Sequence, residues 1–261
     1  MDPDLLRQEA RAPDAVNWRE RLGLGNEKIV AFAGRLIPEK GAVLLARAVA
    51  EIPGAVLLAA GSGPQQAELE ALGARALGPL PHAQVVQLLD QADLYCLPTR
   101  YAEGFPTTLL EAAACGCPIV CTRTAGTGEL LPGPEYGTVL PGDPAGVDVA
   151  ALCAALMETL DHPELAQARA EAARRNLCEH FTWDAVFAKI MEIIRFRRMR
   201  LRIFFNGAIS VRRSEFLLAF PETVRNWFSF FISSSFLRQA THSFRCSSTS
   251  CLLSSLTISS I

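Results

Sequence analysis

The chain has 261 residues, half of them hydrophobic, which is enough for one substantial core or two small ones. It has no run of eighteen uninterrupted apolar residues, and its first fifteen residues are acidic and polar. We therefore expect neither a membrane-spanning helix nor a secretory signal peptide, and we predict a cytoplasmic protein. Four histidines occur, and none lies near the stretch CGCPIVC at 115–121, so buried free thiols are favoured over a metal site.

The net charge of -2 conceals two regions of different composition. Residues 1–195 contain 16 Lys and Arg against 25 Asp and Glu, whereas residues 196–261 contain 9 against 2. Ser62 is the one serine before residue 196 and fourteen follow it, together with ten of the fourteen phenylalanines. We predict that 196–261 is an irregular tail without evolved structure, as translation in a wrong reading frame after about residue 198 would produce. A basic, aromatic arm for membranes or nucleic acids is the alternative.

In chain order, residues 1–24 are interpreted as a linker or N-terminal extension, and four apolar runs follow that have the length of strands. These runs lie at 28–34, 55–61, 94–99 and 118–122. Helical patterns occupy the intervals and the end of this region, at 39–50, 64–72, 82–92, 107–116, 147–160, 163–181 and 184–195. Near-continuous apolar strands that alternate with helices indicate a parallel sheet with helices on both faces. The expected fold is therefore a Rossmann-like α/β domain over residues 25–195.

Two cations follow the first expected strand, in GRLIPEKG at 34–41. Ligands bind beyond the carboxyl ends of the strands in an open parallel sheet, and Arg35 and Lys40 lie in that region. Two cations beside a helix start can hold an anion without a metal. The alternative is that Lys40 is a solvated surface residue and that Arg35 pairs with an acidic neighbour.

The stretch EGFPTTLLEAAACG at 103–116 has the features of a second anion-binding helix start. Pro106 lacks an N–H and suits the first helical turn, and Gly104 permits close approach of the backbone to a ligand. The free amides around Thr107 and Thr108 would point from the helix start toward an anion. This stretch therefore extends the predicted site of Arg35 and Lys40.

Two glutamates, Glu103 and Glu111, lie on either side of this helix start, and an acid in so apolar a stretch calls for an explanation. Glu111 lies four residues after Thr107, on the same face and about 6 Å along the axis, which is roughly the span from a phosphate to the ribose of one nucleotide. A carboxylate that accepts hydrogen bonds from two vicinal hydroxyls would explain an acid in so apolar a helix. Glu103, just outside the helix, would face whatever is attached beyond the phosphates. Local capping or pairing of Glu111 is the alternative.

These residues resemble a known family. The paired-glutamate pattern, in which seven residues separate two Glu, is similar to that of retaining glycosyltransferases of family 4, which have the GT-B fold. The segments GRLIPEKG, AAGSGP, LGPLP, LYCLPTRYAEGFPTTLLEAAACGCPIVCT and TAGTGELL resemble that family's donor-binding domain in order and spacing. The resemblance covers about residues 20–195, so the domain is expected to be one half of a GT-B enzyme.

The resemblance implies a metal-independent site for a nucleoside-diphosphate sugar, linked to UDP or GDP, as substrate and without a cofactor. Arg35 and Lys40, in the loop that Gly34 opens, would hold the donor diphosphate in place of a metal. Amides near Phe105, Thr107 and Thr108 would assist them.

The two glutamates and one leucine receive their roles from the same resemblance. Glu111 would bind the ribose hydroxyls, and Glu103, counted with Arg35 and Lys40 as catalytic, would contact the donor sugar. Leu80, after Gly78, would contact the base through its backbone. One departure is that Pro106 replaces a glycine common in the family, which removes an amide donor.

The larger departure is that nothing in the sequence corresponds to the family's N-terminal, acceptor-binding domain. We therefore expect the chain to bind donor but to be inactive alone, with the acceptor-binding domain missing or supplied by another chain. The acceptor could also place the protein at the inner face of a membrane; no nucleic-acid partner is expected.

Two other functions compete with sugar transfer. The first is a non-catalytic module that holds a nucleotide sugar. The second is a dinucleotide-dependent oxidoreductase, suggested by GSGPQQ at 61–66 after a strand. That match is poor, because Gln66 stands where the dinucleotide-binding fingerprint has Gly or Ala.

Overall fold

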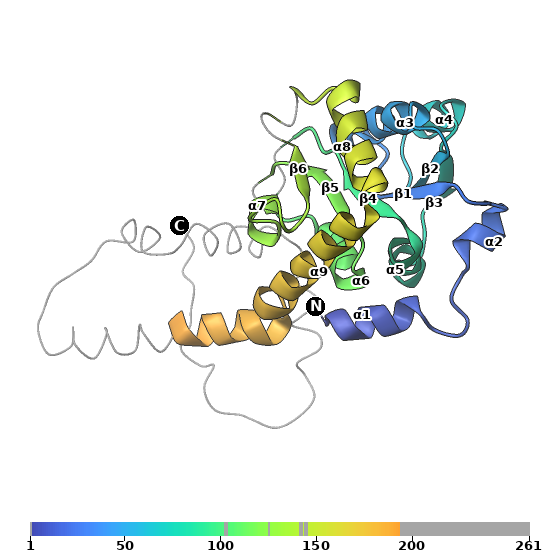
Figure 1. Ribbon diagram of the computed structural model, residues 1–261. Helices are drawn as coiled ribbons and strands as arrows, with labels where there is room; N and C mark the ends of the chain where they lie inside the picture. The colour runs from blue at the N-terminus through green and yellow to red at the C-terminus, as the bar shows by residue number, and fades with distance from the viewer. Residues whose placement is uncertain (1, 102–103, 125, 141–142, 144–145, 194–261) are drawn as a thin grey trace, which may run out of the picture. The chain divides into compact units, whose positions relative to one another are not determined.

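The structure is a computed structural model that describes residues 2–101, 104–124, 126–140, 143 and 146–193 (Figure 1). One parallel sheet of six strands forms its centre, in the order β3-β2-β1-β4-β5-β6. The strands are β1 (Lys28–Ala33), β2 (Ala55–Ala60), β3 (Arg75–Gly78), β4 (Leu94–Leu97), β5 (Ile119–Thr122) and β6 (Thr138–Leu140). The four apolar runs expected to be strands are confirmed as β1, β2, β4 and β5, and the two outermost strands were not predicted.

Helices cover both faces of this sheet, which confirms the predicted Rossmann-like α/β fold (Figure 1). One face carries α3 (Ala42–Ala50), α4 (Gln66–Ala71) and α8 (Val149–Asp161). The other carries α5 (His82–Gln91) and α6 (Thr107–Cys115), which pack against each other. The chain after β1 also contains the short elements η1 (Pro38–Lys40) and α7 (Thr127–Leu130) and the long α9 (Pro163–His180).

The strand order reverses direction between β1 and β4, and this point determines where a ligand can enter. β1 pairs with β2 on one side, at Lys28 with Ala55, and with β4 on the other, at Val30 with Leu94. The strands β1 and β4 are almost completely buried, as near-continuous apolar sequence requires when helices cover both faces. In open parallel sheets ligands bind beyond the carboxyl ends of the strands at such a switch point, which here lies after β1 and β4.

The first 24 residues contain two short helices that pack on the domain. The helix α1 (Pro3–Ala10) lies against α5 and α6, and the Asp2 side chain caps it by accepting from the amides of Asp4 and Leu5. The helix α2 (Trp18–Leu22) buries Trp18, of which 1% is exposed. The segment interpreted as a linker or extension thus contributes apolar side chains to the core.

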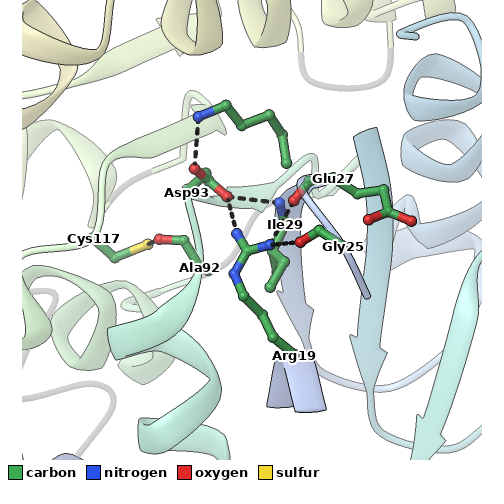
Figure 2. Close-up of polar contacts among 8 residues, drawn as sticks. Arg19, Gly25, Glu27, Ile29, Ala92, Asp93 and Cys117 are labelled. Atoms are coloured by element: carbon green, nitrogen blue, oxygen red, sulfur yellow. Dashed lines mark hydrogen bonds and ion pairs between the residues drawn. The ribbon is translucent and has the colours of Figure 1, made fainter. Parts of the chain in front are cut away.

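Asp93, immediately before β4, joins the α2 segment to the sheet (Figure 2). Its carboxylate lies 3.1 Å from Nη2 of Arg19 and 3.1 Å from Nζ of Lys28, and it accepts the backbone N–H of Ile29 at 2.8 Å. Arg19 also donates to the carbonyl oxygens of Gly25 and Glu27. One carboxylate therefore holds the entry into β1 and the start of β4 together.

A further helix spans residues 183–193 after α9. It exposes Trp183, Phe187 and Ile190, with 58%, 63% and 38% of each residue accessible. The tail predicted for 196–261 lies outside the described residues. Within the described part of the chain, no helix is both long enough and apolar enough to cross a bilayer.

Candidate functional site

Backbone contacts join the loops after β1 and β2 at the carboxyl edge of the sheet. Leu36 donates its N–H to the carbonyl oxygen of Ser62 at 3.0 Å. A Cβ at Gly61 would overlap the carbonyl oxygen of Gly34, and one at Gly63 would overlap that of Leu36. Gly61 also has a φ of +135°, which L side chains rarely adopt. Two glycines thus allow the two loops to lie against each other without side chains between them.

Arg35 extends from this joined pair of loops into solvent. It is exposed, and within the described residues no acidic side chain forms an ion pair with it. Arg35 follows the end of β1, and the alternative, a pairing with an acidic neighbour, is not found in this part of the chain; its binding of an anion stays a prediction. An unpaired guanidinium at a switch point is suited to an incoming anion.

Lys40, the last residue of η1, lies beside the segment that follows β4. Its Nζ is 5.6 Å from the centroid of the Tyr101 ring. The same two segments also meet through their backbones: Arg100 donates its N–H to the carbonyl oxygen of Glu39 at 2.7 Å, and Gly41 is in close contact with the carbonyl of Pro98. Lys40 is consequently held next to the loop that leads into α6.

The start of α6 has backbone amides that no side chain caps within the described residues. Pro106 occupies the N-cap position and Thr107 the first helical position, so α6 begins where the helical pattern at 107–116 predicted. The hydroxyl of Thr108 is turned toward β4, where it accepts a hydrogen bond from the Tyr95 hydroxyl at 2.7 Å. The free amides and positive dipole end of α6 therefore remain available to an anion.

The loop before α6 is supported on its other side by α7 and the end of α9. A Cβ on Gly126 would lie 2.6 Å from the carbonyl oxygen of Gly104 and 2.8 Å from Cα of Phe105. The ring of Phe105 packs at 5.3 Å, centroid to centroid, on Phe181, which directly follows α9. These contacts fix the approach of the chain to the α6 start.

Glu111, in the middle of α6, is almost buried and meets a histidine from α5. Oε1 of Glu111 lies 3.3 Å from Nε2 of His82, the first residue of α5. The Glu111 side chain is 10% exposed and that of His82 is 59% exposed. Among the described residues Glu111 has no second polar partner. The carboxylate therefore keeps acceptor capacity that the fold does not use.

The described site residues that were predicted lie on loops and helix starts beyond the carboxyl ends of the parallel strands, except for Glu111, which lies one turn inside α6. The described ones are Gly34, Arg35, Lys40, Leu80, Gly104, Phe105, Pro106, Thr107, Thr108 and Glu111. Leu80 lies in the connection between β3 and α5, two residues before His82. Glu103, predicted to contact the donor sugar, lies outside the described residues.

Two contributors to this edge were missed by sequence reasoning, His82 and Gly126. The single available signal for His82 was its place two residues after Leu80, at the start of a helix. Gly126 lies in the motif TAGTGELL, but its contact with Gly104 joins positions far apart in the sequence. Both assignments depend on tertiary contacts.

The cysteines within the described residues are free, and Cys96, Cys115, Cys117 and Cys121 are buried in the core as predicted. Burial raises the pKa of Cys115 and of Cys121 to about 12, so both thiols stay protonated at neutral pH. Over the part of the chain that the structure describes, no group of three His, Cys, Asp or Glu is arranged to hold a metal ion.

A cavity of about 280 Å³ lies at the opposite, amino edge of the sheet. Its lining includes Arg11 and Asp90, which form an ion pair at 3.0 Å, and Lys28 and Asp93, which pair at 3.1 Å. Because these charges are satisfied within the fold, and because ligands of open α/β sheets bind at the carboxyl edge, we assign the site to the carboxyl edge.

Comparison with known proteins identifies the family. The sequence profile described as "Glycosyl transferases group 1" matches residues 14–176, more than half of the chain. The chain belongs to the group 1 glycosyltransferases. The expectation of a GT-B glycosyltransferase domain is thereby confirmed at the level of this family.

One curated relative of this group 1 chain is the GDP-mannose-dependent alpha-(1-6)-phosphatidylinositol monomannoside mannosyltransferase of Mycolicibacterium smegmatis. It is 32% identical over 206 residues, which are 71% of this chain and 53% of the relative. The chain thus spans about half the length of that relative.

Solved structures show the same fold. The Anabaena protein HepE in complex with UDP-glucose has a TM-score of 0.62 at 22% identity, and the match covers 75% of this chain and 55% of HepE. The C-terminal domain of the group 1 protein LpcC from Francisella tularensis has a TM-score of 0.54 at 17% identity, with 70% of this chain and 99% of that domain covered. The described part of the chain therefore has the fold of these two structures.

Proposed function

We propose that this chain is the donor-binding half of a retaining, metal-independent glycosyltransferase of family 4. It binds a nucleoside-diphosphate sugar, and the sugar passes to an acceptor hydroxyl once an acceptor-binding half closes the cleft. The observation that carries the proposal is Glu111: an almost buried carboxylate with unused acceptor capacity, one turn inside an uncapped helix start at the switch point. Burying such a carboxylate has a cost that a ribose with two hydroxyls would offset.

The charges at the same edge fit the remainder of the ligand. Arg35 is exposed and Lys40 is held beside Tyr101, so two cations accompany the free amides of α6. Together they would hold the diphosphate and stabilise it as a leaving group when the bond from the sugar's anomeric carbon breaks. The amides replace the role that a divalent ion has in other phosphoryl sites.

The relatives agree with a nucleotide-sugar donor but differ in the base. The printed name of the mannosyltransferase specifies GDP-mannose, whereas the HepE structure contains UDP-glucose. We therefore propose UDP or GDP sugars as donors for this chain. The fold likeness to a separate C-terminal domain, together with the exposed Trp183, Phe187 and Ile190 at 183–193, supports a second domain that covers this helix.

Calorimetry with UDP, GDP, their sugars and inorganic pyrophosphate, without divalent metal, tests the proposal. At least one nucleotide should bind. Glu111→Ala should weaken the nucleotide about 10- to 100-fold, because a carboxylate that accepts from two hydroxyls is lost. Pyrophosphate, which has no ribose, should bind both proteins alike. Glu111→Gln has nearly the same shape as Glu111 but lacks the charge, so it should weaken nucleotide binding without leaving a cavity. Glu51→Ala, which removes an exposed acid, is the control and should bind like wild type.

If Glu111→Ala weakened nucleotide and pyrophosphate equally, Glu111 would not bind the ribose. If the folded wild-type protein bound none of the nucleotides, the proposal would be overturned. The alternative, a non-catalytic nucleotide-sugar module, predicts the same binding. The two functions differ in turnover. When the donor-loaded chain is mixed with an acceptor and the separately expressed acceptor-binding half of a relative, the transferase releases nucleoside diphosphate and the non-catalytic module does not.

A further inference from the structure

His82 contacts Glu111 from a neighbouring helix. It begins α5, directly after Pro81, and its imidazole Nε2 lies 3.3 Å from Oε1 of Glu111 on α6. The two helices pack side by side on one face of the sheet. The contact joins the segment that contains Leu80 to the helix that begins beyond β4, and both are parts of the candidate site.

The exposures of the two side chains differ greatly, and this difference argues against a purely structural pair. With 59% of its side chain accessible, His82 contributes little to the core, while the Glu111 carboxylate is 10% accessible. A histidine that only filled space would be expected to be buried itself. Here an exposed ring reaches inward to a carboxylate that the rest of the described structure leaves without a partner.

The carboxylate retains room for a ligand after the histidine contact. A carboxylate offers about four lone-pair directions on its two oxygens, and the His82 Nε2, at 3.3 Å, approaches Oε1 alone. The Cys115 thiol lies one turn after Glu111 on α6. Burial raises the pKa of this thiol to about 12, and the Glu111 charge contributes to the rise, so the thiol carries no charge that would compete for His82.

We propose that His82 is a positioning residue for the nucleotide: it holds the Glu111 carboxylate so that its remaining lone pairs face the two vicinal hydroxyls of the ribose. The inference rests on the proposed function, since it assumes that Glu111 binds ribose. His82 itself acts through Glu111 and needs no contact with the ligand.

The test compares His82→Phe, which keeps a ring but removes the N–H, with His82→Gln, which keeps a donor. Three ligands are titrated by calorimetry: the nucleoside diphosphate that the wild type binds, its 2′,3′-dideoxy analogue, and inorganic pyrophosphate. His82→Phe should weaken the ribonucleotide about 5- to 10-fold and leave the other two ligands unchanged. His82→Gln should restore most of the loss. His162→Phe, an exposed histidine before α9, is the matched control.

The outcomes separate this inference from the proposed function. Unchanged ribonucleotide binding by His82→Phe would overturn the role of His82, as would an equal loss with the dideoxy analogue, which would indicate general disturbance of the site. If Glu111→Ala loses ribose discrimination while His82→Phe keeps it, the proposed function stands and the positioning role fails. If the wild type binds no nucleoside diphosphate, the proposed function itself fails.

Discussion

The two edges of the sheet carry charged residues in different states. At the amino edge, Asp93 gathers Arg19, Lys28 and a backbone amide, and Asp90 pairs with Arg11 through three contacts of 3.0 to 3.1 Å. These charges are satisfied by one another. They hold the N-terminal helices against the domain, so they contribute to the fold.

At the carboxyl edge the corresponding groups are left open within the described residues. Arg35 has no acidic partner, Glu111 meets only the imidazole of His82, and no side chain caps the start of α6. Keeping the Glu111 carboxylate almost buried with spare acceptor capacity has an energetic cost, whereas the exposed Arg35 can be hydrated until a ligand binds. The contrast therefore distinguishes the charges at the amino edge, which stabilise the fold, from those at the carboxyl edge, which are proposed to bind a ligand.

The largest expected effect is at the amino edge. Asp93→Ala should lower the free energy of unfolding by about 2–3 kcal/mol, because two cations and an amide lose their shared acceptor. Urea denaturation measures this, and nucleotide affinity of the folded protein should not change. The exposed Asp14→Ala is the control and should stay within about 0.5 kcal/mol. If Asp93→Ala kept full stability but bound nucleotide less tightly, the ligand site would lie at the amino edge and not at the carboxyl edge.

The next effect concerns binding at the carboxyl edge. Arg35→Ala should weaken nucleotide and pyrophosphate alike by about 10-fold, since it removes a charge from the diphosphate and leaves the ribose contact intact. The free energy of unfolding should stay within about 0.5 kcal/mol of wild type. Arg75→Ala, an exposed cation at the start of β3, should change neither quantity. If Arg35→Ala unfolds the protein instead, Arg35 belongs with the structural charges.

The smallest effect concerns Glu129 on α7, beyond the end of β5. Burial raises the pKa of Glu129, and Lys189 opposes this rise. A raised folded-state pKa means that the ionised form is disfavoured, so stability is lost as pH rises through that pKa. Glu129→Gln should therefore raise Tm at pH 7, by no more than about 2 °C given the solvent screening, and should have no effect near pH 4. A lower Tm at pH 7 would show that the charge of Glu129 stabilises the fold.

The sequence predicted the central strands well and the outer ones poorly. Strands β1, β2, β4 and β5 are covered on both faces, so their sequences are almost continuously apolar and easily recognised. The outermost strands β3 (Arg75–Gly78) and β6 (Thr138–Leu140) have four and three residues, too few to show a period. The packing of α1 was also beyond prediction, because its burial depends on the surfaces of α5 and α6.

Sequence patterns predicted those site residues that come soon after a strand or stand out in an apolar helix. Arg35 and Lys40 come directly after an apolar run, and Glu111 stands out as one acid in an apolar helix. His82 could not be assigned to Glu111, since the two are separated by 29 positions and meet only when α5 packs on α6. The unused acceptor capacity of Glu111 is likewise a property of its surroundings.

The glycine contacts between the loops after β1 and β2 have a consequence for the cost of binding. Gly61 and Gly63 let the two loops lie backbone to backbone, and this contact restrains both loops. A diphosphate that binds at this edge would contact two loops that need little rearrangement. Little conformational entropy would then be surrendered on association, and the affinity of this edge would be set by its charges and amides rather than by loop ordering.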